Sequence, residues 1–434
     1  MKILVVGSGA REHALVKKLS SEPSVEGVIC APGNAGVDRE HSTGTISLNM
    51  SDPEAILSIA ESEAIDLTVV GPELPLANGV ADLFASHDRF LFGPKKSAAR
   101  LESSKAFAKL FMARHAIPTA GFEVCENYEQ ALTLIRNNRF GPSVVVKADG
   151  LAAGKGVTVA ADHTTAESAI RDAMVERRFG DAGTNLVLEE CLTGPEVSYF
   201  VITDGTKFVS LPSAQDHKRV FDNDLGPNTG GMGAFAPSPL LTPEVEQFVI
   251  KNIVGPTIEG MRQEGNEYRG VLYLGLMLTD EGPKVIEFNV RFGDPEAQII
   301  LPMVESELAP ALLAAAQGNL GDVDWRLSTE PHVGVVMASG GYPGKHETGF
   351  PITGIDRAEK VAGAQVVHAG TLIKDEDMVT NGGRVLTVVA SGESFASAIE
   401  RAYKGVGHIS FEGSHVRRDI GQKALYIQDV SEKR

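Results

Sequence analysis

The strongest constraint on the fold is the alternation of short apolar runs and helical stretches in the first hundred residues. Lys2–Val6 (KILVV), Val25–Cys30 and Asp66–Val70 (DLTVV) have the composition of buried strands. A helix is expected to end near Leu19, and an amphipathic helix is expected over Pro53–Ala64. Apolar strands alternating with helices indicate a parallel sheet covered on both faces.

The middle of the chain follows a different pattern. From Gly121 to about Asp324 strands follow one another closely, which favours antiparallel pairing and an α+β fold. A single long helix is expected over Ser97–Ala116, and Gly226–Pro239 is expected to be an irregular loop inside this region. The strands are expected at Val144–Lys147, Val157–Ala161, Leu186–Glu190, Val197–Thr203, Val271–Leu278 and Lys284–Asn289, and the helices at about 127–138, 165–178, 243–264 and 305–317.

The last hundred residues return to strands with few helices. Strands are expected at Val333–Ala338 and Arg384–Ala390, and one clear helix at Ser394–Tyr403. A chain of 434 residues is long enough for about three domains of roughly 150 residues each. The sequence therefore predicts an N-terminal parallel α/β domain, an α+β middle and a smaller mixed α/β C-terminal domain.

Charge and cysteine content limit the class of protein. The net charge of −17 argues against a general nucleic-acid binder, which needs a basic face, but a few local cations can still hold a small anion. Three cysteines do not make a disulfide framework, and no run approaches 18 consecutive apolar residues. We expect a cytoplasmic protein that has no membrane span and does not bind nucleic acid.

Three turns follow predicted strands of the N-terminal sheet. Gly9 lies in VVGSGAREHA, Asn34 in Pro-Gly-Asn, and Glu73 in Gly-Pro-Glu. Loops after parallel strands meet at one sheet edge, where ligands bind. The dinucleotide pattern is incomplete, because Glu12 takes the third glycine position and the second strand does not end in an acid. NAD is disfavoured, a mononucleotide or sugar phosphate is possible, and a turn that binds nothing is the simple alternative.

Two segments together indicate an ATP site. VVVKADGLAAGKGV (144–157) places Lys147 at a strand end and Lys155 in a glycine-rich turn, as in a flap over phosphates, although it is not a Walker loop. NLVLEECLTGPEVS (185–198) ends a strand at Glu189 and begins another at Glu196, where backbone and carboxylate groups could contact adenine and ribose. Surface lysines and an ordinary hairpin are the alternatives.

KVIEFNVRFGDPEAQ (284–298) carries the sharpest local signal. Glu287 and Asn289 are two residues apart on a strand, so their side chains share a face and offer the hard oxygens that suit Mg²⁺. Arg291 follows in the same alternation with a fork that matches carboxylate or phosphate. The alternative is the exposed polar face of an edge strand.

A further glycine-rich stretch carries no charge of its own. GPNTGGMGAFAPSP (226–239) could present backbone N–H groups to an oxyanion, and the preceding SAQDHKRV supplies Asp216, Lys218 and Arg219. An ordinary surface loop is the alternative. We find no HExxH or GxSxG motif, so neither that metal site nor an acyl-enzyme is indicated.

These motifs together resemble one family. RFGDPEAQ after IEFN, with GSGAREHA, GPE, KADGLAAGKGV, QDHKR, PNTGGMGA and HVRRDIG, is similar to the phosphoribosylamine–glycine ligase (glycinamide ribonucleotide synthetase) family of purine synthesis. That family belongs to the ATP-grasp superfamily, which holds its nucleotide between two α+β lobes. The resemblance implies domains at 1–102, 103–328 with a flap subdomain at about 121–192, and 329–434. It also implies a monomer that uses ATP, glycine and 5-phosphoribosylamine.

The resemblance assigns a role to each candidate residue. Glu287 and Asn289 would hold Mg²⁺ (or Mn²⁺), and a strand without an acid until Asp280 leaves the number of metal ions open. Arg291, Lys218 and Asp216 would be catalytic. ATP would contact Lys105, Lys147, Lys155, Glu189, Leu192 and Glu196, and the other substrates would contact Gly9, Asn34, Glu73, Gly231 and Asp294.

Three other readings stay open. The chain could act on a different carboxylate and amine pair, bind ATP without ligase activity, or be an NAD oxidoreductase. Only the ligase readings require an acid, an amide and an arginine to alternate along one strand.

Overall fold

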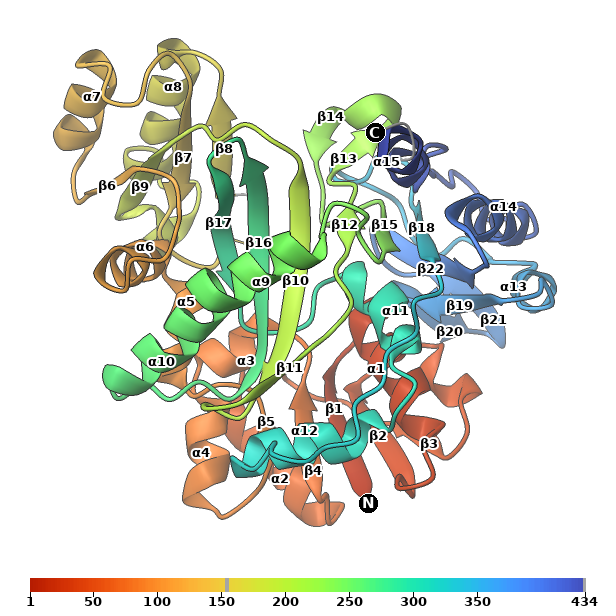
Figure 1. Cartoon of the computed structure of the whole chain (residues 1–434). Coiled ribbons are helices and arrows are strands. Elements are labelled where there is room, and N and C mark those ends of the chain that lie inside the picture. The colour runs from red at the N-terminus through yellow and green to blue at the C-terminus, as the bar shows by residue number, and fades with distance from the viewer. Residues whose placement is uncertain (153–155, 432–434) are drawn as a thin grey trace.

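The computed structural model describes residues 1–152 and 156–431, and its N-terminal part is a parallel sheet (Figure 1). All pairings within this sheet are parallel, as expected from the apolar strands. Helices α1 (Ala10–Ser20), α2 (Pro53–Ser62), α3 (Glu73–Ala77) and α4 (Val80–Ser86) connect its strands. The strands run in the order β3 (Thr43–Thr45), β2 (Gly27–Pro32), β1 (Lys2–Gly7), β4 (Leu67–Val70) and β5 (Leu91–Phe92).

Two antiparallel sheets follow in the middle of the chain. The first, here called the lid sheet, has the order β6 (Phe122–Cys125), β9 (Leu186–Glu190), β7 (Val144–Ala148) and β8 (Val157–Ala160), with α7 (Tyr128–Arg136) and α8 (His163–Met174). The second, here called the base sheet, has the order β11 (Phe208–Ser210), β10 (Glu196–Thr203), β16 (Gly270–Thr279) and β17 (Gly282–Asn289). The predicted antiparallel pairing is confirmed.

A fourth sheet joins the middle of the chain to its C-terminal part. The order is β12 (Gln215–Asp216), β15 (Gly233–Ala236), β18 (His332–Ala338), β22 (Arg384–Ser391) and β19 (Ala364–His368). Helix α14 (Phe395–Val406) packs on it, and α13 (Ile355–Ala358) and α15 (Gln422–Ser431) lie nearby (Figure 1). Short ribbons β13 (Arg219–Phe221) with β14 (Leu225–Asn228), and β20 (Thr371–Lys374) with β21 (Asp377–Thr380), complete the strands described.

The single helix expected over Ser97–Ala116 is wrong. The structure has α5 (Lys96–Ser103) and α6 (Lys105–Arg114), which meet at an extended Ser104. The Ser104 hydroxyl caps α6 by accepting from the Phe107 N–H at 3.1 Å, and it donates to Asp149 Oδ1 at 2.9 Å. A serine whose side chain replaces a backbone partner ends one helix and starts the next.

A second expectation is wrong, and a third is confirmed with one added detail. Gly226–Pro239 is not an irregular loop, because it contains most of β14 and the whole of β15, whose partner β18 lies a hundred residues further along the chain. The helix expected over 243–264 is present and continuous over residues 243–263, as α9 (Pro243–Val249), a π-helical turn at Ile250–Val254 and α10 (Gly255–Gln263).

The hydrophobic cores explain which parts of the chain are fixed to one another. One core contains Phe288 and Val290, at the end of β17, together with Leu4 and Val6 of β1. The lid sheet has a separate core, whose buried residues all lie between Cys125 and Leu188. The base sheet is therefore fixed to the N-terminal sheet, whereas the lid sheet packs mainly on its own helices.

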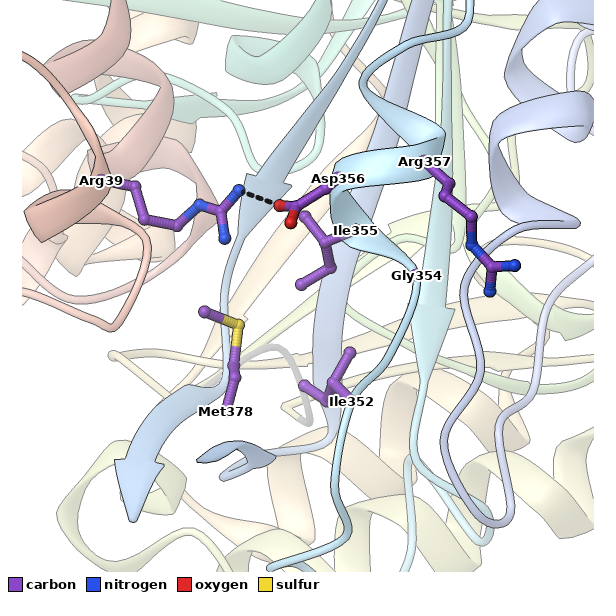
Figure 2. Close-up of a pocket in the computed structure, with 7 residues that line it drawn as sticks. All are labelled: Arg39, Ile352, Gly354, Ile355, Asp356, Arg357 and Met378. Atoms are coloured by element: carbon purple, nitrogen blue, oxygen red, sulfur yellow. Dashed lines mark hydrogen bonds and ion pairs between the residues drawn. The ribbon is translucent and has the colours of Figure 1, made fainter. Parts of the chain in front are cut away.

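The N- and C-terminal parts also touch. Arg39 Nη2 lies 2.9 Å from Asp356 Oδ1 and 3.0 Å from Glu359 Oε2, beside a cavity of about 300 Å³ (Figure 2). The Asn34 side-chain amide donates to the His368 carbonyl at 3.0 Å.

No helix among residues 1–152 and 156–431 is long and apolar enough to cross a membrane.

Candidate active site

Strand β17 presents an acid and an amide at one face of the base sheet. Glu287 lies opposite Gly275 of β16, and Asn289 lies opposite Tyr273. A side chain at Gly275 would crowd the Glu287 Cγ, which lies 3.2 Å from the position a Cβ would take. The missing side chain at position 275 therefore leaves room for the Glu287 carboxylate. The predicted common face of Glu287 and Asn289 agrees with their alternation along the strand.

Positive charge surrounds this strand. Burial raises the pKa of Glu287, but nearby cations more than offset it, and the pKa is lowered from its usual value. Lys147 Nζ, on β7 of the lid sheet, donates to the Ile286 carbonyl at 3.0 Å, directly beside Glu287. An ionised carboxylate among several cations is the environment that a metal–triphosphate complex needs. The cations acting on Glu287 are Lys218, Lys147, Lys105 and Arg291.

The donor set of β17 fits a hard divalent cation that keeps other ligands. Glu287 and Asn289 offer two oxygens, although Asn289 Oδ1 also accepts from Arg291 Nη2 at 3.1 Å. Within residues 1–152 and 156–431 there is no group of three or more His, Cys, Asp or Glu arranged to hold a metal. Phosphate oxygens and water would have to supply the remaining ligands, as Mg²⁺ prefers.

Arg291 lies just beyond β17 and connects three parts of the site. Its Nη2 lies 2.8 Å from Glu102 Oε1, and its Nε lies 3.6 Å from Glu73 Oε2. The Nε is buried and has no hydrogen-bond partner among the described residues. Burial raises the pKa of Glu102, while the Arg291 charge opposes this shift. Glu102 was not predicted as a site residue, because a single acid near a helix end gives no sequence signal.

A second polar cluster lies between β10, β12 and β16. The Lys218 ammonium pairs with the Glu196 carboxylate. Burial raises the pKa of Asp216 despite the nearby Lys218 charge. The structure adds Glu296, which is 2% exposed and accepts from the Tyr273 hydroxyl at 2.7 Å. Glu296 lies within RFGDPEAQ, so the motif contained this residue although the prediction did not single it out.

The lid sheet contributes a buried cluster of charges. Glu189 on β9 lies between two lysines, with Lys147 Nζ 2.9 Å from its Oε1 and Lys109 Nζ 2.9 Å from its Oε2. All three side chains are 5% exposed or less. The Glu189 carboxylate is therefore engaged within the protein, and Lys109 is a site neighbour that the sequence analysis missed.

The other expected ATP contacts lie around the lid sheet. Lys105, the first residue of α6, donates from Nζ to the Gly150 carbonyl at 3.1 Å. Leu192 lies in the connection between β9 and β10. Lys155 lies outside the described residues.

The turns of the N-terminal sheet meet at one edge, as predicted. The Asn34 amide nitrogen donates to the Ser8 carbonyl at 2.9 Å and the Gly9 carbonyl at 3.3 Å. The Gly9 N–H donates to Glu12 Oε2 at 2.6 Å. Glu12, which takes the third glycine position of the dinucleotide pattern, thus places its own carboxylate at the N-terminus of α1. Asn34 and Gly9 hold the turns together, and a ligand here would meet an acid as well as backbone groups.

Asp294 and Gly231 meet residues of the C-terminal part. Arg384 on β22 places Nη2 3.1 Å from Asp294 Oδ2 and donates from Nη1 to the Gly230 carbonyl at 2.7 Å. The Gly230 N–H donates to the Tyr342 hydroxyl oxygen at 2.9 Å. Gly231 has a φ of +109°, and a Cβ there would lie 2.4 Å from Pro295 Cδ. Arg384 and Tyr342 give no motif in the sequence and were not predicted.

Two sheets with a cationic, metal-compatible face between them define an ATP-grasp ligase. Comparison with known proteins gives the same answer in more detail. Profiles of the phosphoribosylglycinamide synthetase N domain, ATP-grasp (A) domain and C domain match residues 1–102, 103–297 and 332–423. The chain belongs to the phosphoribosylglycinamide synthetase family, as the sequence motifs indicated.

The chain is similar to curated proteins over nearly its full length. It is 48% identical over 427 residues to the phosphoribosylamine–glycine ligase of Escherichia coli K12, covering 98% of this chain and 99% of that one. It is 46% identical over 426 residues to the ligase of Vibrio cholerae, with the same coverage.

Solved structures agree on the fold. The phosphoribosylamine–glycine ligase of Thermotoga maritima aligns with a TM-score of 0.84 at 34% identity, covering 96% of this chain and 100% of that one. A biotin carboxylase of Campylobacter jejuni aligns with a TM-score of 0.73 at 16% identity, covering 96% and 92%. The second likeness concerns the fold alone. The expected fold class is confirmed.

Proposed function

We propose that this chain joins glycine to 5-phosphoribosylamine at the expense of ATP, giving glycinamide ribonucleotide, ADP and phosphate. The observation that carries the proposal is the face of β17, where an ionised Glu287 lies beside Asn289 and among cations from both sheets. Membership of the phosphoribosylglycinamide synthetase family supports the choice of substrates.

The reaction needs an activated carboxylate, because a carboxylate oxygen is a poor leaving group. A glycine oxygen attacks the γ-phosphorus, the bond to the β,γ-bridging oxygen breaks, and ADP leaves. The amine nitrogen of phosphoribosylamine then attacks the glycyl carbonyl carbon, and the phosphate leaves as the amine loses a proton. The protein supplies alignment and charge neutralisation rather than a nucleophile.

The residues present divide these tasks. Glu287 and Asn289 would hold a divalent cation, and Mg²⁺ suits their oxygens, with Mn²⁺ as a substitute. When bound, this ion would neutralise negative charge on the phosphates of the nucleotide. Lys147 donates to a carbonyl of β17, and the charge of Lys105 on α6 acts on Glu287, which supports their role as phosphate ligands. We assign the same role to Lys155.

Arg291 and the polar cluster of Asp216, Lys218 and Glu196 would contact the groups that react. The buried Nε of Arg291, without a partner among the described residues, is suited to a carboxylate or a phosphoryl oxygen. Asp216, which lies near the Lys218 charge, would help to position glycine and the transferred phosphoryl group. Lys218, paired with Glu196, would neutralise charge on the transferred phosphoryl group.

The remaining candidates stay proposals of the same kind. Leu192 and Glu196 would contact adenosine. We expected Glu189 there as well, but its pairing with Lys147 supports a role in holding that phosphate ligand. Gly9, Asn34, Glu73, Gly231 and Asp294 would line the site of phosphoribosylamine, which is supported by the meeting of their loops. We further propose three domains at 1–102, 103–328 and 329–434, which the three matched profiles support, and a cytoplasmic location, which the free cysteines support. We also propose that the protein is a monomer.

Phosphate release from ATP, with each substrate omitted in turn, tests the function. The proposal predicts glycinamide ribonucleotide and stoichiometric phosphate only when glycine and phosphoribosylamine are both present. Turnover with another amino acid and none with glycine would refute the substrate assignment and favour a ligase of a different carboxylate and amine.

A further inference from the structure

A cationic cavity lies apart from the proposed active site. It has a volume of about 360 Å³ and is bounded by α4, the residues on either side of β5, the turn between α10 and β16, and the end of α12 (Leu308–Gln317). Pockets that hold small ligands begin at about 300 Å³. None of its lining residues belongs to the set assigned above to ATP, metal, glycine or phosphoribosylamine.

The charge of this cavity is unusual for a chain with a net charge of −17. Arg89, Lys95 and Arg269 line it, whereas Glu267 is the single carboxylate among its lining residues. Glu267 already pairs with Arg269, at 3.0 Å from Nη2. Arg89 and Lys95 form no ion pair with any residue in 1–152 or 156–431. The cavity therefore carries about two uncompensated positive charges, which select an anion.

Arg269 is partly prepared for such a ligand. Its Nη1 donates to the Ala316 carbonyl at 3.1 Å, which fixes the guanidinium at the cavity wall. Its Nε is buried and has no hydrogen-bond acceptor among the described residues. The guanidinium, held by the Ala316 carbonyl and by Glu267, presents its positive charge to the cavity that it lines.

Part of the remaining wall is apolar. Phe90 lines the cavity with 44% of its surface exposed, and Ala81, Ala85 and Ala316 lie around the same space. An exposed aromatic ring beside cations offers a stacking surface for a planar base next to charged groups for a phosphate. This combination fits a nucleotide better than an inorganic anion.

The cavity is separated from β17 by the length of a helix. Lys95 and Ser97 lie at the start of α5, and Glu102, the partner of Arg291, lies near its end. An eight-residue helix is roughly 12 Å long at 1.5 Å per residue. A ligand in the cavity would therefore not overlap a nucleotide bound at β17.

We propose that this cavity is a second nucleotide site, which binds a nucleoside monophosphate with its phosphate at Arg89, Lys95 and Arg269 and its base against Phe90. The proposal does not depend on the identity of the ligase substrates, because no residue of the cavity takes part in that assignment.

Equilibrium binding of AMP tests the proposal. The full-length protein is first saturated with Mg²⁺ and a non-hydrolysable ATP analogue, so that the β17 site is filled. AMP is expected to bind still, and the double variant R89Q/K95Q is expected to bind it at least tenfold more weakly. The matched control K374Q/K404Q removes two exposed charges elsewhere and is expected to bind AMP like the parent protein.

Two further ligands distinguish the contribution of the phosphate to binding from that of the base. Adenosine and inorganic phosphate are each expected to bind at least tenfold more weakly than AMP. Ligase turnover of R89Q/K95Q without AMP is expected to equal that of the parent, which shows that the variant is folded. No AMP binding to the loaded protein, equal binding by R89Q/K95Q, or equal binding of adenosine or phosphate would overturn the proposal.

Discussion

Replacing Lys109 by methionine tests how the lid sheet is fixed to the rest of the molecule. Lys109 is 2% exposed, and its Nζ lies 2.9 Å from Glu189 Oε2 and donates to Thr119 Oγ1 at 2.7 Å. Thr119 in turn donates to the Val285 carbonyl of β17 at 2.6 Å. Lys109 thus links α6, the lid sheet and β17 through buried polar contacts.

The magnitude follows from what remains after the change. Removing one partner of a buried ion pair costs about 3–5 kcal/mol when the other charge is left alone. Here Glu189 keeps Lys147, so the loss is nearer the value of one hydrogen bond to a charged group, and we expect about 2–3 kcal/mol. Without Lys109, the Glu189 carboxylate would pair with Lys147 alone and bind it more tightly. Because Lys147 is a proposed phosphate ligand, the KM for ATP should then rise about tenfold.

Urea unfolding and steady-state kinetics measure both effects. The control is Lys404→Met, an exposed lysine on α14, for which we expect a change of less than about 0.5 kcal/mol. If Lys109→Met were as stable as this control and kept the parent KM for ATP, the Lys109–Glu189–Lys147 cluster would have no role in positioning the lid sheet.

Three further predictions concern single carboxylates. Glu287→Ala should abolish turnover at every Mg²⁺ concentration while the melting temperature stays near that of the parent; near-normal activity in a Mg²⁺ titration would refute the metal assignment. Glu102→Gln should lower kcat about tenfold without changing the KM for ATP, because the Arg291 guanidinium loses its charged partner; an unchanged kcat would contradict this. Burial raises the pKa of Glu40, but hydrogen bonds from His13 and Lys17 lower it to about 2. Its contribution to stability is present above about pH 4.5 and lost as pH falls toward 2, so urea unfolding of Glu40→Gln should approach that of the parent over this range; a constant difference would exclude the ion pair as its source.

The sequence was most informative where one strand carried the chemistry. Glu287 and Asn289 were placed on one face by alternation alone, and the structure has them on β17 opposite Gly275 and Tyr273. The turns at Gly9, Asn34 and Glu73 were expected at one sheet edge, because parallel strands bring their carboxyl ends together.

Residues that act through distant partners were not visible in the sequence. Lys109 lies in KAFAKLFMAR, where a lysine has the pattern of a solvated helix face, and only the fold brings Glu189 to it. Arg384 follows a glycine pair in the C-terminal part, far from Gly230 and Asp294, which it contacts.

Strand pairing and helix breaks that depend on distant partners are also not visible in the sequence. Strand β15 gives no strand signal because it is short and lies in a stretch rich in glycine and proline, and its partner β18 begins about a hundred residues later. The break at Ser104 was missed because Asp149, which fixes that serine, comes from the lid sheet. Local composition does not contain either of these partners.

A crystal structure of the chain with Mg²⁺, a non-hydrolysable ATP analogue and glycine tests the central claim most directly. We expect the triphosphate to lie between the lid sheet and β17, with the metal ion bound to Glu287 and Asn289 and the glycine carboxylate near Arg291. A triphosphate bound away from β17, or a metal ion without contact to Glu287, would contradict the account.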